Sequence, residues 1–296
     1  MELNFKSVFE KDGYVVVRGM FSKEEIKSMR EGIERSLKEN INSDLLSNPY
    51  LNHIPTDERV LKVYRYLLGT DRPCWWGEGN WRVEKIALGW HKDNAQRFCP
   101  GAPDWTEPYT VIRSGIYLQD HKNYSGGLSL RAGSHKICNL DGGGLRYFDS
   151  EPGDMAFWHQ TITHTGGGRI TKWFPKKLID PHNYWQYPDS KFKPMPKEKR
   201  IAVFMNMGKR DACLTRHLNY LKTRTDMIKI WQNTAYDQKR IDEAKDLLDV
   251  IKVADEVKDW SLDNLSQRHH DLPYSKIFLN DQFKKELAWK DYHLEK

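Results

Sequence analysis

The sequence has few cysteines, no long hydrophobic run and no dense block of one charge. Only 4 of its 296 residues are cysteine and none forms a C-x-x-C pair, which argues against a structural zinc site or a disulfide framework. The longest apolar stretches, such as 201–205, are far shorter than the roughly 20 residues of a membrane-spanning helix. Residues 1–6 show no signal-peptide pattern, so we expect a cytoplasmic protein that does not bind membranes.

The excess of positive charge is spread along the chain. The 47 basic residues outnumber the 41 acidic residues by 6, and the two kinds are interleaved. We therefore expect no nucleic acid partner, and we interpret the excess as local assistance in binding an anionic small molecule. An aromatic content of 12% beside 30% charged residues is typical of a globular protein with a polar surface.

Hydrophobic spacing predicts helices towards both ends of the chain. A turn at Asp12-Gly13 and a short β-branched strand precede Ser22, where the capping box Ser22-x-x-Glu25 begins a helix that continues through Lys38. Residues 57–69 form a second candidate helix. Beyond Gly208, apolar residues again recur at helical spacing: Leu214, Leu218, Leu221, Ile241, Ala244, Leu248 and Ile251.

Between these ends, short apolar runs are broken by Gly, Pro, Asn and Asp. This pattern predicts a mainly β fold with flanking helices, arranged as a sandwich or barrel. The expected strands are Val83 to Leu88, Thr110 to Leu118, Gly127 to Arg131, Asp154 to Trp158 and Arg200 to Met207. We expect one domain over 1–208 and a helical extension over 209–296 packed on it. The stretch 175–196 is predicted to be a loop inserted between two strands, and long loops are often functional.

Two histidines and a carboxylate stand where they can bind one metal ion. His91 and Asp93 follow a predicted strand and project from the same side of extended backbone. His164 comes 73 positions later (164 − 91), just beyond the predicted strand that starts at Asp154. Such a set on one face of Fe(II) leaves positions open for a bidentate cosubstrate and O₂, unlike the usual four-coordinate geometry of zinc. A single His-x-Asp also arises by chance, and His91 and Asp93 then simply pair at a strand end.

The order of these patterns resembles the phytanoyl-CoA dioxygenase family of Fe(II)- and 2-oxoglutarate-dependent oxygenases. The resemblance spans most of residues 9–208. It rests on Asp12-Gly13-Tyr14-Val15-Val16-Val17 with the helix after Ser22, His91-Lys92-Asp93, Gly126-Gly127-Leu128-Ser129-Leu130-Arg131-Ala132-Gly133-Ser134-His135, the Gly153-Asp154 strand ending at His164, and Arg200-Ile201-Ala202-Val203-Phe204.

The resemblance implies a double-stranded β-helix core, related to jelly rolls and cupins. It implies a non-haem dioxygenase with His91, Asp93 and His164 as Fe(II) ligands, and Arg200 as the cation that binds the distal carboxylate of 2-oxoglutarate. The reaction would consume O₂ and release succinate and CO₂. Since halogenating relatives lack the carboxylate ligand, Asp93 favours hydroxylation.

Arg200 lies 36 positions after His164 (200 − 164), a longer connection than is usual in the family, so Arg169 in a glycine-rich loop is a competing candidate. The resemblance gives His135 a structural role. His159 at its strand end is expected to pack or to support the ligands. We expect His121 and the pair His269-His270 at the surface.

The inserted loop suggests a lid over a polar or anionic substrate, with Gly166-Gly167-Gly168 as a flexible base. Its basic residues are Arg169, Lys172, Lys176 and Lys177, and a solvated loop face explains them equally well. Most of the tryptophans near the motifs are expected in the core.

Two other classes of function stay open. One is a zinc hydrolase with the same ligands, for which no general-base carboxylate or H-E-x-x-H motif is present. The other is a non-catalytic, carbohydrate-type jelly-roll binding protein. Such a protein has no need for all of His91, Asp93, His164 and Arg200.

Overall fold

A computed structural model describes residues 3–84, 89–173 and 177–262 of the chain. It contains two compact units. The first unit comprises Met1–Ser28, Trp81–Asp93 and Ser114–Phe204, and the second comprises Met29–Asn80, Asn94–Arg113 and Met205–Lys296. The expected division of the chain at residue 208 stays a prediction.

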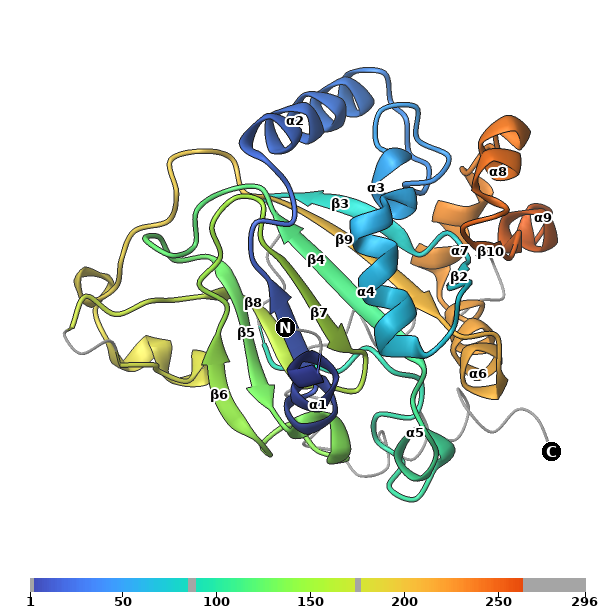
Figure 1. Cartoon of the computed structure of the whole chain (residues 1–296). Coiled ribbons are helices and arrows are strands. Elements are labelled where there is room, and N and C mark those ends of the chain that lie inside the picture. Colours follow the sequence, from blue (N-terminus) through green and yellow to red (C-terminus); the bar gives the residue numbers. More distant parts are fainter. Residues whose placement is uncertain (1–2, 85–88, 174–176, 263–296) are drawn as a thin grey trace. The chain divides into compact units, whose positions relative to one another are not determined.

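The first unit is built from two sheets, whose strands lie side by side in Figure 1. The order in one sheet is β1-β7-β4-β9, with β3 also paired to β9, and in the other it is β6-β5-β8. The strands are β1 (Tyr14–Val17), β3 (Gly79–Val83), β4 (Val111–Tyr117), β5 (Gly127–Ala132), β6 (Gly144–Tyr147), β7 (Met155–His159), β8 (His164–Gly168) and β9 (Ile201–Gly208). Strands β3, β4 and β9 each continue into the second unit.

The chain alternates between these two sheets. It passes from β4 to β5 and β6 in the opposite sheet, returns to β7, crosses to β8 and returns again to β9. Buried side chains of both sheets form one hydrophobic cluster: Tyr117, Leu128, Leu130, Phe148, Ala156, Trp158, Ile162 and Ala202. Alternation of this kind around a shared core is a double-stranded β-helix, a relative of the jelly roll. The predicted fold class, mainly β with flanking helices, is confirmed.

The N-terminal elements follow the local sequence signals. Helix α2 (Lys23–Lys38) begins at the predicted capping box, in which the Ser22 N–H donates to Glu25 Oε2 at 2.7 Å and the Glu25 N–H donates to Ser22 Oγ at 3.2 Å. Helix α1 (Leu3–Asp12), which sequence reasoning missed, precedes the turn at Gly13. Helix α2 runs from the first unit into the second, which begins at Met29. The short 3₁₀ helices η1 (Ser134–Lys136), η2 (Pro181–Gln186) and η3 (Asp189–Lys191) belong to the first unit.

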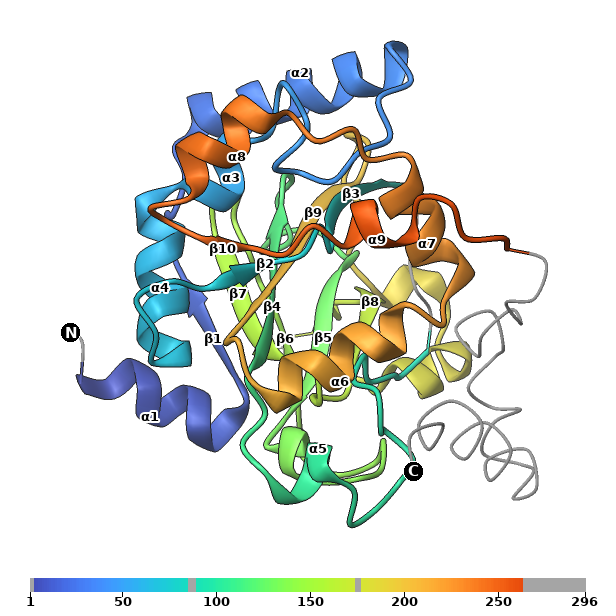
Figure 2. The same cartoon turned by 90° about the vertical axis from the view of Figure 1, so that its right-hand side faces the viewer.

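The second unit is mainly helical. Figure 2 shows its short strands β2 (Cys74–Trp75) and β10 (Asp249–Val250), which pair in parallel. Its helices are α3 (His53–Thr56), α4 (Glu58–Leu68), α5 (Pro103–Thr106), α6 (Ala212–Leu221), α7 (Thr225–Gln232), α8 (Gln238–Ala244) and α9 (Val253–Val257). Of these, α6, α7 and α9 supply side chains to a buried cluster that includes Trp76, Leu221 and Trp231.

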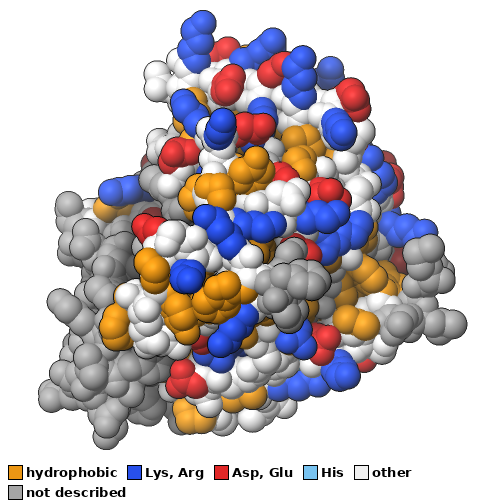
Figure 3. Space-filling view, turned by 90° about the vertical axis from the view of Figure 1, so that its left-hand side faces the viewer, with side chains coloured by type: hydrophobic (Ala, Val, Ile, Leu, Met, Phe, Trp, Pro, Cys, Tyr) orange, Lys and Arg blue, Asp and Glu red, His pale blue; other side chains and the backbone are white. Residues whose placement is uncertain are grey.

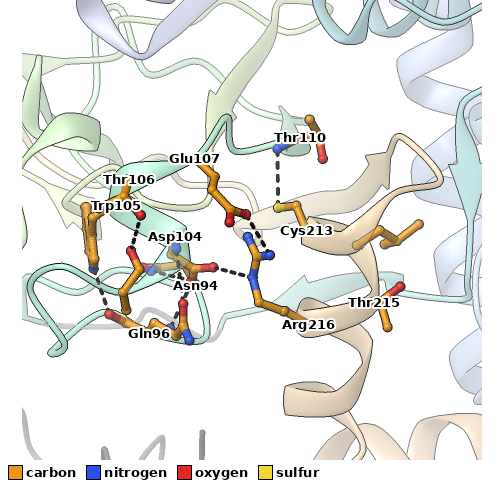
Figure 4. Close-up of polar contacts among 12 residues, drawn as sticks. Asn94, Gln96, Asp104, Trp105, Thr106, Glu107, Thr110, Cys213, Thr215 and Arg216 are labelled. Carbon is orange, nitrogen blue, oxygen red and sulfur yellow. Dashed lines mark hydrogen bonds and ion pairs between the residues drawn. The ribbon is translucent and has the colours of Figure 1, made fainter. Parts of the chain in front are cut away.

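A buried carboxylate organises the loop that leads into α5 (Figure 4). Asp104 Oδ2 accepts hydrogen bonds from the Gln96 N–H at 2.9 Å and from Asn94 Nδ2 at 3.0 Å. Its Oδ1 lies 3.5 Å from Nε of Arg216, which comes from α6. The indole N–H of Trp105 donates to Gln96 O at 2.8 Å. The loop is therefore held by side-chain hydrogen bonds instead of a sheet.

Two expectations for secondary structure need correction. The strand expected over Val83 to Leu88 lies earlier, at Gly79–Val83, and residues 85–88 fall outside the described part of the chain. The helical face expected to continue to Ile251 ends with α8, because Asp249–Val250 pairs with β2. Much of the expected extension, 263–296, also falls outside the described residues. No helix in the described part of the chain is long and apolar enough to cross a membrane.

Gly153 forms the turn before β7 and has no room for a side chain. Its φ is +103°, and a Cβ there would lie 2.2 Å from the backbone oxygen of Phe21. We expect Gly153→Ala to lower the free energy of unfolding by roughly 2–4 kcal/mol, because strain and a backbone clash add. Gly19→Ala is the control, since φ there is +60° with no atom within 4 Å. Urea unfolding that shows equal losses for the two variants contradicts this account.

Three buried histidines make the fold sensitive to acid. Burial lowers the pKa of His121 and His135 to about 4 and that of His159 to about 3. These imidazoles stay neutral in the folded state but take up protons near pH 6.5 once unfolded. The contribution of these histidines to the free energy of unfolding is therefore fully present above about pH 6.5. It is lost as the pH falls towards about 4. We expect His159→Phe to flatten this dependence, as measured by urea unfolding at each pH; an unchanged slope would count against it.

Candidate metal centre

His91, Asp93 and His164 converge on one point in the first unit. Their candidate ligand atoms all lie within 4.8 Å of one another. Nε2 of His164 is 3.3 Å from Asp93 Oδ2, and Nε2 of His91 is 4.0 Å from Asp93 Oδ1. The three side chains are only 14%, 9% and 6% exposed in chain order, so the cluster is largely shielded from water. Sequence reasoning selected all three residues, and the structure brings them together.

Backbone pairing sets the spacing of the two histidines. The His91 N–H donates to His164 O at 3.0 Å, and the His164 N–H donates to His91 O at 2.9 Å. This isolated antiparallel bridge adds residue 91 to the edge of the β6-β5-β8 sheet. The Asp93 N–H donates to Gln160 O at 2.9 Å. A two-residue bridge therefore joins ligands 73 positions apart (164 − 91) in the chain.

Both imidazoles are oriented by a carbonyl group. His91 Nδ1 lies 3.0 Å from Gly89 O, and His164 Nδ1 lies 3.1 Å from Ile162 O. A carbonyl oxygen accepts only, so each Nδ1 carries the proton and each Nε2 presents its lone pair on the side of Asp93. This is the tautomer that a metal-binding histidine needs.

Lys92, between the ligands, was missed as a support residue. Its side chain is fully buried, and its ammonium donates to Ser134 O at 2.7 Å and to Thr161 O at 2.6 Å. These bonds tie the segment that carries His91 and Asp93 to η1 and to the turn after β7. The sequence signal was its position at the centre of His-x-Asp, where alternation turns it away from the ligands.

The donor set fits a divalent transition metal. Two imidazole nitrogens and one carboxylate suit iron, and three protein ligands on one side leave other coordination positions for a cosubstrate. No other group of three such residues lies within metal-binding distance in the part of the chain that the structure describes.

Arg200 and Arg169 have different surroundings. Arg200, directly before β9, is 5% exposed; its Nε donates to Gly126 O at 3.0 Å and its guanidinium lies 5.3 Å from the centre of the Tyr117 ring. Arg169 forms an ion pair with Asp189 at 2.7 Å, and that carboxylate is 91% exposed. Of the two candidate arginines, Arg200 is thus the buried one.

His121 is buried, so its expected surface position was wrong. It lies 2.7 Å from Gln119 Nε2 through its own Nε2 and 3.2 Å from Ser125 O through Nδ1. Burial and then the nearby charge of Arg200 lower its pKa to about 4. The Ile201 N–H in turn donates to Gln119 Oε1 at 2.7 Å, so a neutral His121 supports the strand that Arg200 precedes.

His135 and His159 lie outside the ligand group. Their rings stack at 4.9 Å, and Phe9 of α1 stacks on His159 at 4.3 Å. This fits the expected structural use of His135 and the packing role of His159. The expectation for His269 and His270 concerns residues outside the described part.

Two buried polar groups near the ligands have no hydrogen-bond partner. These are the indole N–H of Trp158 and the side-chain amide of Gln160. The centre of the Trp158 ring lies 5.7 Å from that of the His164 ring, and the backbone carbonyl of Gln160 accepts the Asp93 N–H. Nearly all buried polar groups in native proteins have partners. Such groups require a water molecule or a polar ligand as a partner.

The glycine-rich base expected for a flexible lid is part of a strand. Gly166, Gly167 and Gly168 belong to β8, and Gly168 pairs with Gly127. A Cβ at Gly168 would lie 2.4 Å from Ser129 Oγ and 2.7 Å from the Tyr147 ring, so glycine is needed for packing. Lys172 and Lys177 are exposed, while Lys176 is not among the described residues.

No family model matches the chain, and no curated protein matches its sequence. Similar solved structures include the non-heme alpha-ketoglutarate-dependent carbocyclase SnoK from nogalamycin biosynthesis, with a TM-score of 0.49 and 15% identity over 73% of this chain and 90% of that one. HygX from Streptomyces hygroscopicus with nickel and 2-oxoglutarate bound has a TM-score of 0.47 and 16% identity over 71% and 87%. EctD from S. alaskensis with 2-oxoglutarate and 5-hydroxyectoine has a TM-score of 0.47 and 14% identity over 70% and 76%.

Likeness at this level does not decide what the chain binds or catalyses. The resemblance to phytanoyl-CoA dioxygenases therefore stays a prediction, and the chemistry of the site has to follow from its own residues.

We expect His164→Ala to weaken binding of Ni(II), used as a stable probe of the site, by roughly 100-fold or more, because even supporting residues around a metal contribute 10–100-fold. His182→Ala is the matched control, since His182 is an exposed histidine of η2 in the same unit. Isothermal titration calorimetry measures both affinities. Equal affinities for the two variants would exclude His164 as a ligand.

Proposed function

We propose that the protein is a non-haem Fe(II)- and 2-oxoglutarate-dependent dioxygenase that hydroxylates a C–H bond of a polar or anionic small molecule. The observation that carries this proposal is the convergence of His91, Asp93 and His164, with both histidines held in the metal-binding tautomer. Three protein ligands on one side of Fe(II) leave coordination positions for the bidentate cosubstrate and for O₂.

When bound, Fe(II) with 2-oxoglutarate and O₂ supplies the oxidation of an unactivated C–H bond, and the cosubstrate leaves as succinate and CO₂. The chain's own residues provide binding, orientation and exclusion of water. Leu130 pairs with His164 across the sheet, and Trp158 and Phe204 lie together on the inner side. These apolar groups keep one side of the site dry, which strengthens the electrostatic interactions within it.

We propose Arg200 as the residue that binds the distal carboxylate of 2-oxoglutarate. A guanidinium suits this task because its planar fork forms two parallel hydrogen bonds with a carboxylate. Its Nε is already oriented by Gly126 O, and the Tyr117 ring lies against its face. Arg169 is the weaker candidate, because its ion pair with Asp189 lies towards solvent.

The class of substrate is proposed from charge. The chain has a formal charge of +6, and on the face shown in Figure 3 basic side chains occur among acidic and hydrophobic ones. Charge distributed in this way suits attraction of a small anion more than binding of a nucleic acid backbone. Asp93 favours hydroxylation, since it occupies the position that a halide takes in halogenating relatives.

The test is an anaerobic titration of Fe(II)-loaded protein with 2-oxoglutarate, followed by the visible metal-to-ligand charge-transfer band. We expect the band in the wild type and its loss in His91→Ala. Arg200→Ala should need at least about 10-fold more 2-oxoglutarate, equivalent to about 1.4 kcal/mol of binding free energy. Arg169→Ala is the control and should titrate like the wild type.

Absence of the band from metal-loaded wild-type protein would exclude the proposed function and favour a zinc hydrolase or a binding protein. A normal titration for Arg200→Ala with a weakened one for Arg169→Ala would transfer the carboxylate-binding role to Arg169.

A further inference from the structure

A carboxylate of the inserted segment reaches the outer side of the metal centre. Asp180, which caps η2, accepts the Trp90 indole N–H on Oδ1 at 2.9 Å. Its Oδ2 lies 2.5 Å from Nη2 of Arg131, a residue of β5. The Arg131 guanidinium also lies 4.9 Å from the centre of the Trp90 ring. Asp180, Trp90 and Arg131 thus form a closed triangle of contacts, here named the Asp180 cluster.

This cluster lies behind both histidine ligands. Trp90 directly precedes His91, and Arg131 directly follows Leu130, the residue that pairs with His164. The Arg131 N–H also donates to Thr163 O at 2.9 Å. Side chains of consecutive residues in extended backbone lie on opposite sides, so the cluster faces away from the ligands while sharing their backbone.

The contacts of the cluster are well shielded. Trp90 is fully buried, and the side chains of Arg131 and Asp180 are 15% and 22% exposed. A second donor of Arg131, Nη1, binds Asp141 O at 3.1 Å. Charge-assisted hydrogen bonds in such surroundings are stronger and more directional than pairs at the surface. Removal of the Asp180 charge would leave Arg131 with a poorly solvated positive charge.

From these contacts we infer that Asp180 is a positioning residue for the metal centre. By holding Trp90 and Arg131 together, it fixes the backbone that carries His91 against the strands that carry His164. The inserted segment accordingly serves as a brace on the outer face of the sheet, and not as a lid that swings on a glycine hinge. This inference rests on the proposed function only in requiring that the site binds a divalent metal ion.

The experiment compares Co(II) binding by the wild type and by Asp180→Asn, read from the visible absorption of the bound ion. Supports around metal ligands typically contribute 10–100-fold in affinity, so we expect a loss of at least about 10-fold and an altered Co(II) spectrum. Asp189→Asn is the matched control, because this acid of the same segment pairs with Arg169 in solvent. It should bind Co(II) with the affinity and spectrum of the wild type.

A second variant keeps the test valid if Asp180→Asn fails to fold. Trp90→Phe retains an aromatic ring next to Arg131 and removes the N–H that Asp180 accepts, together with part of the buried indole. We expect a smaller loss of Co(II) affinity in the same direction. Urea unfolding of the metal-free proteins checks that each variant is folded at the start of its titration.

The outcomes separate this inference from the proposed function. Wild-type affinity and spectrum in both Asp180→Asn and Trp90→Phe would overturn the role of the cluster, whatever the site catalyses. A loss of Co(II) affinity in Asp180→Asn, together with the absence of the 2-oxoglutarate charge-transfer band in the wild type, would support the positioning role of Asp180 and exclude the dioxygenase. Failure of the wild type to bind Co(II) would overturn both.

Discussion

The reciprocal backbone hydrogen bonds between His91 and His164 are the interaction on which the site depends. They join the segment after β3 to the start of β8, and they place two imidazoles with ring centres 4.2 Å apart. Asp93 is held beside them because its backbone N–H donates to Gln160 O. Strand pairing, a feature of the fold, thus brings the candidate ligands together without a metal ion. Preorganisation of this kind reduces the ordering that metal binding has to bring about.

Support for the ligands comes from opposite directions. Backbone carbonyls orient the rings through Nδ1, and the buried ammonium of Lys92 ties their segment to two further carbonyl groups. From outside the sheet, the Asp180 cluster holds the residues next to His91 and Leu130. Metal centres are tuned as much by such supporting contacts as by the ligands themselves. Trp158, whose indole N–H has no hydrogen-bond partner, and the buried cation Arg200 take no part in these supporting contacts.

Much of the fold followed from local signals in the sequence. The capping box before α2, the helix over 57–69 and the strands later seen as β1, β4, β5, β7 and β9 were predicted because their patterns lie within a few residues. Strand β8 was missed, since its sequence His-Thr-Gly-Gly-Gly has low strand propensity and depends on pairing with β5. His121 was misplaced for a similar reason, because only its contacts with Gln119 and Ser125 reveal its burial.

By itself, the sequence determined the kinds of chemistry available: two histidines and a carboxylate in a family-like order, and an arginine before a β-strand. It also determined the local elements, since capping, turns and apolar alternation act over short spans. Only the tertiary structure decided that residues 73 positions apart (164 − 91) meet, that Arg200 is buried while Arg169 pairs at the surface, and that Asp180 reaches Trp90 and Arg131. Such contacts join segments far apart in the chain, and no local pattern encodes which distant strand, carbonyl or charge will lie opposite a given residue.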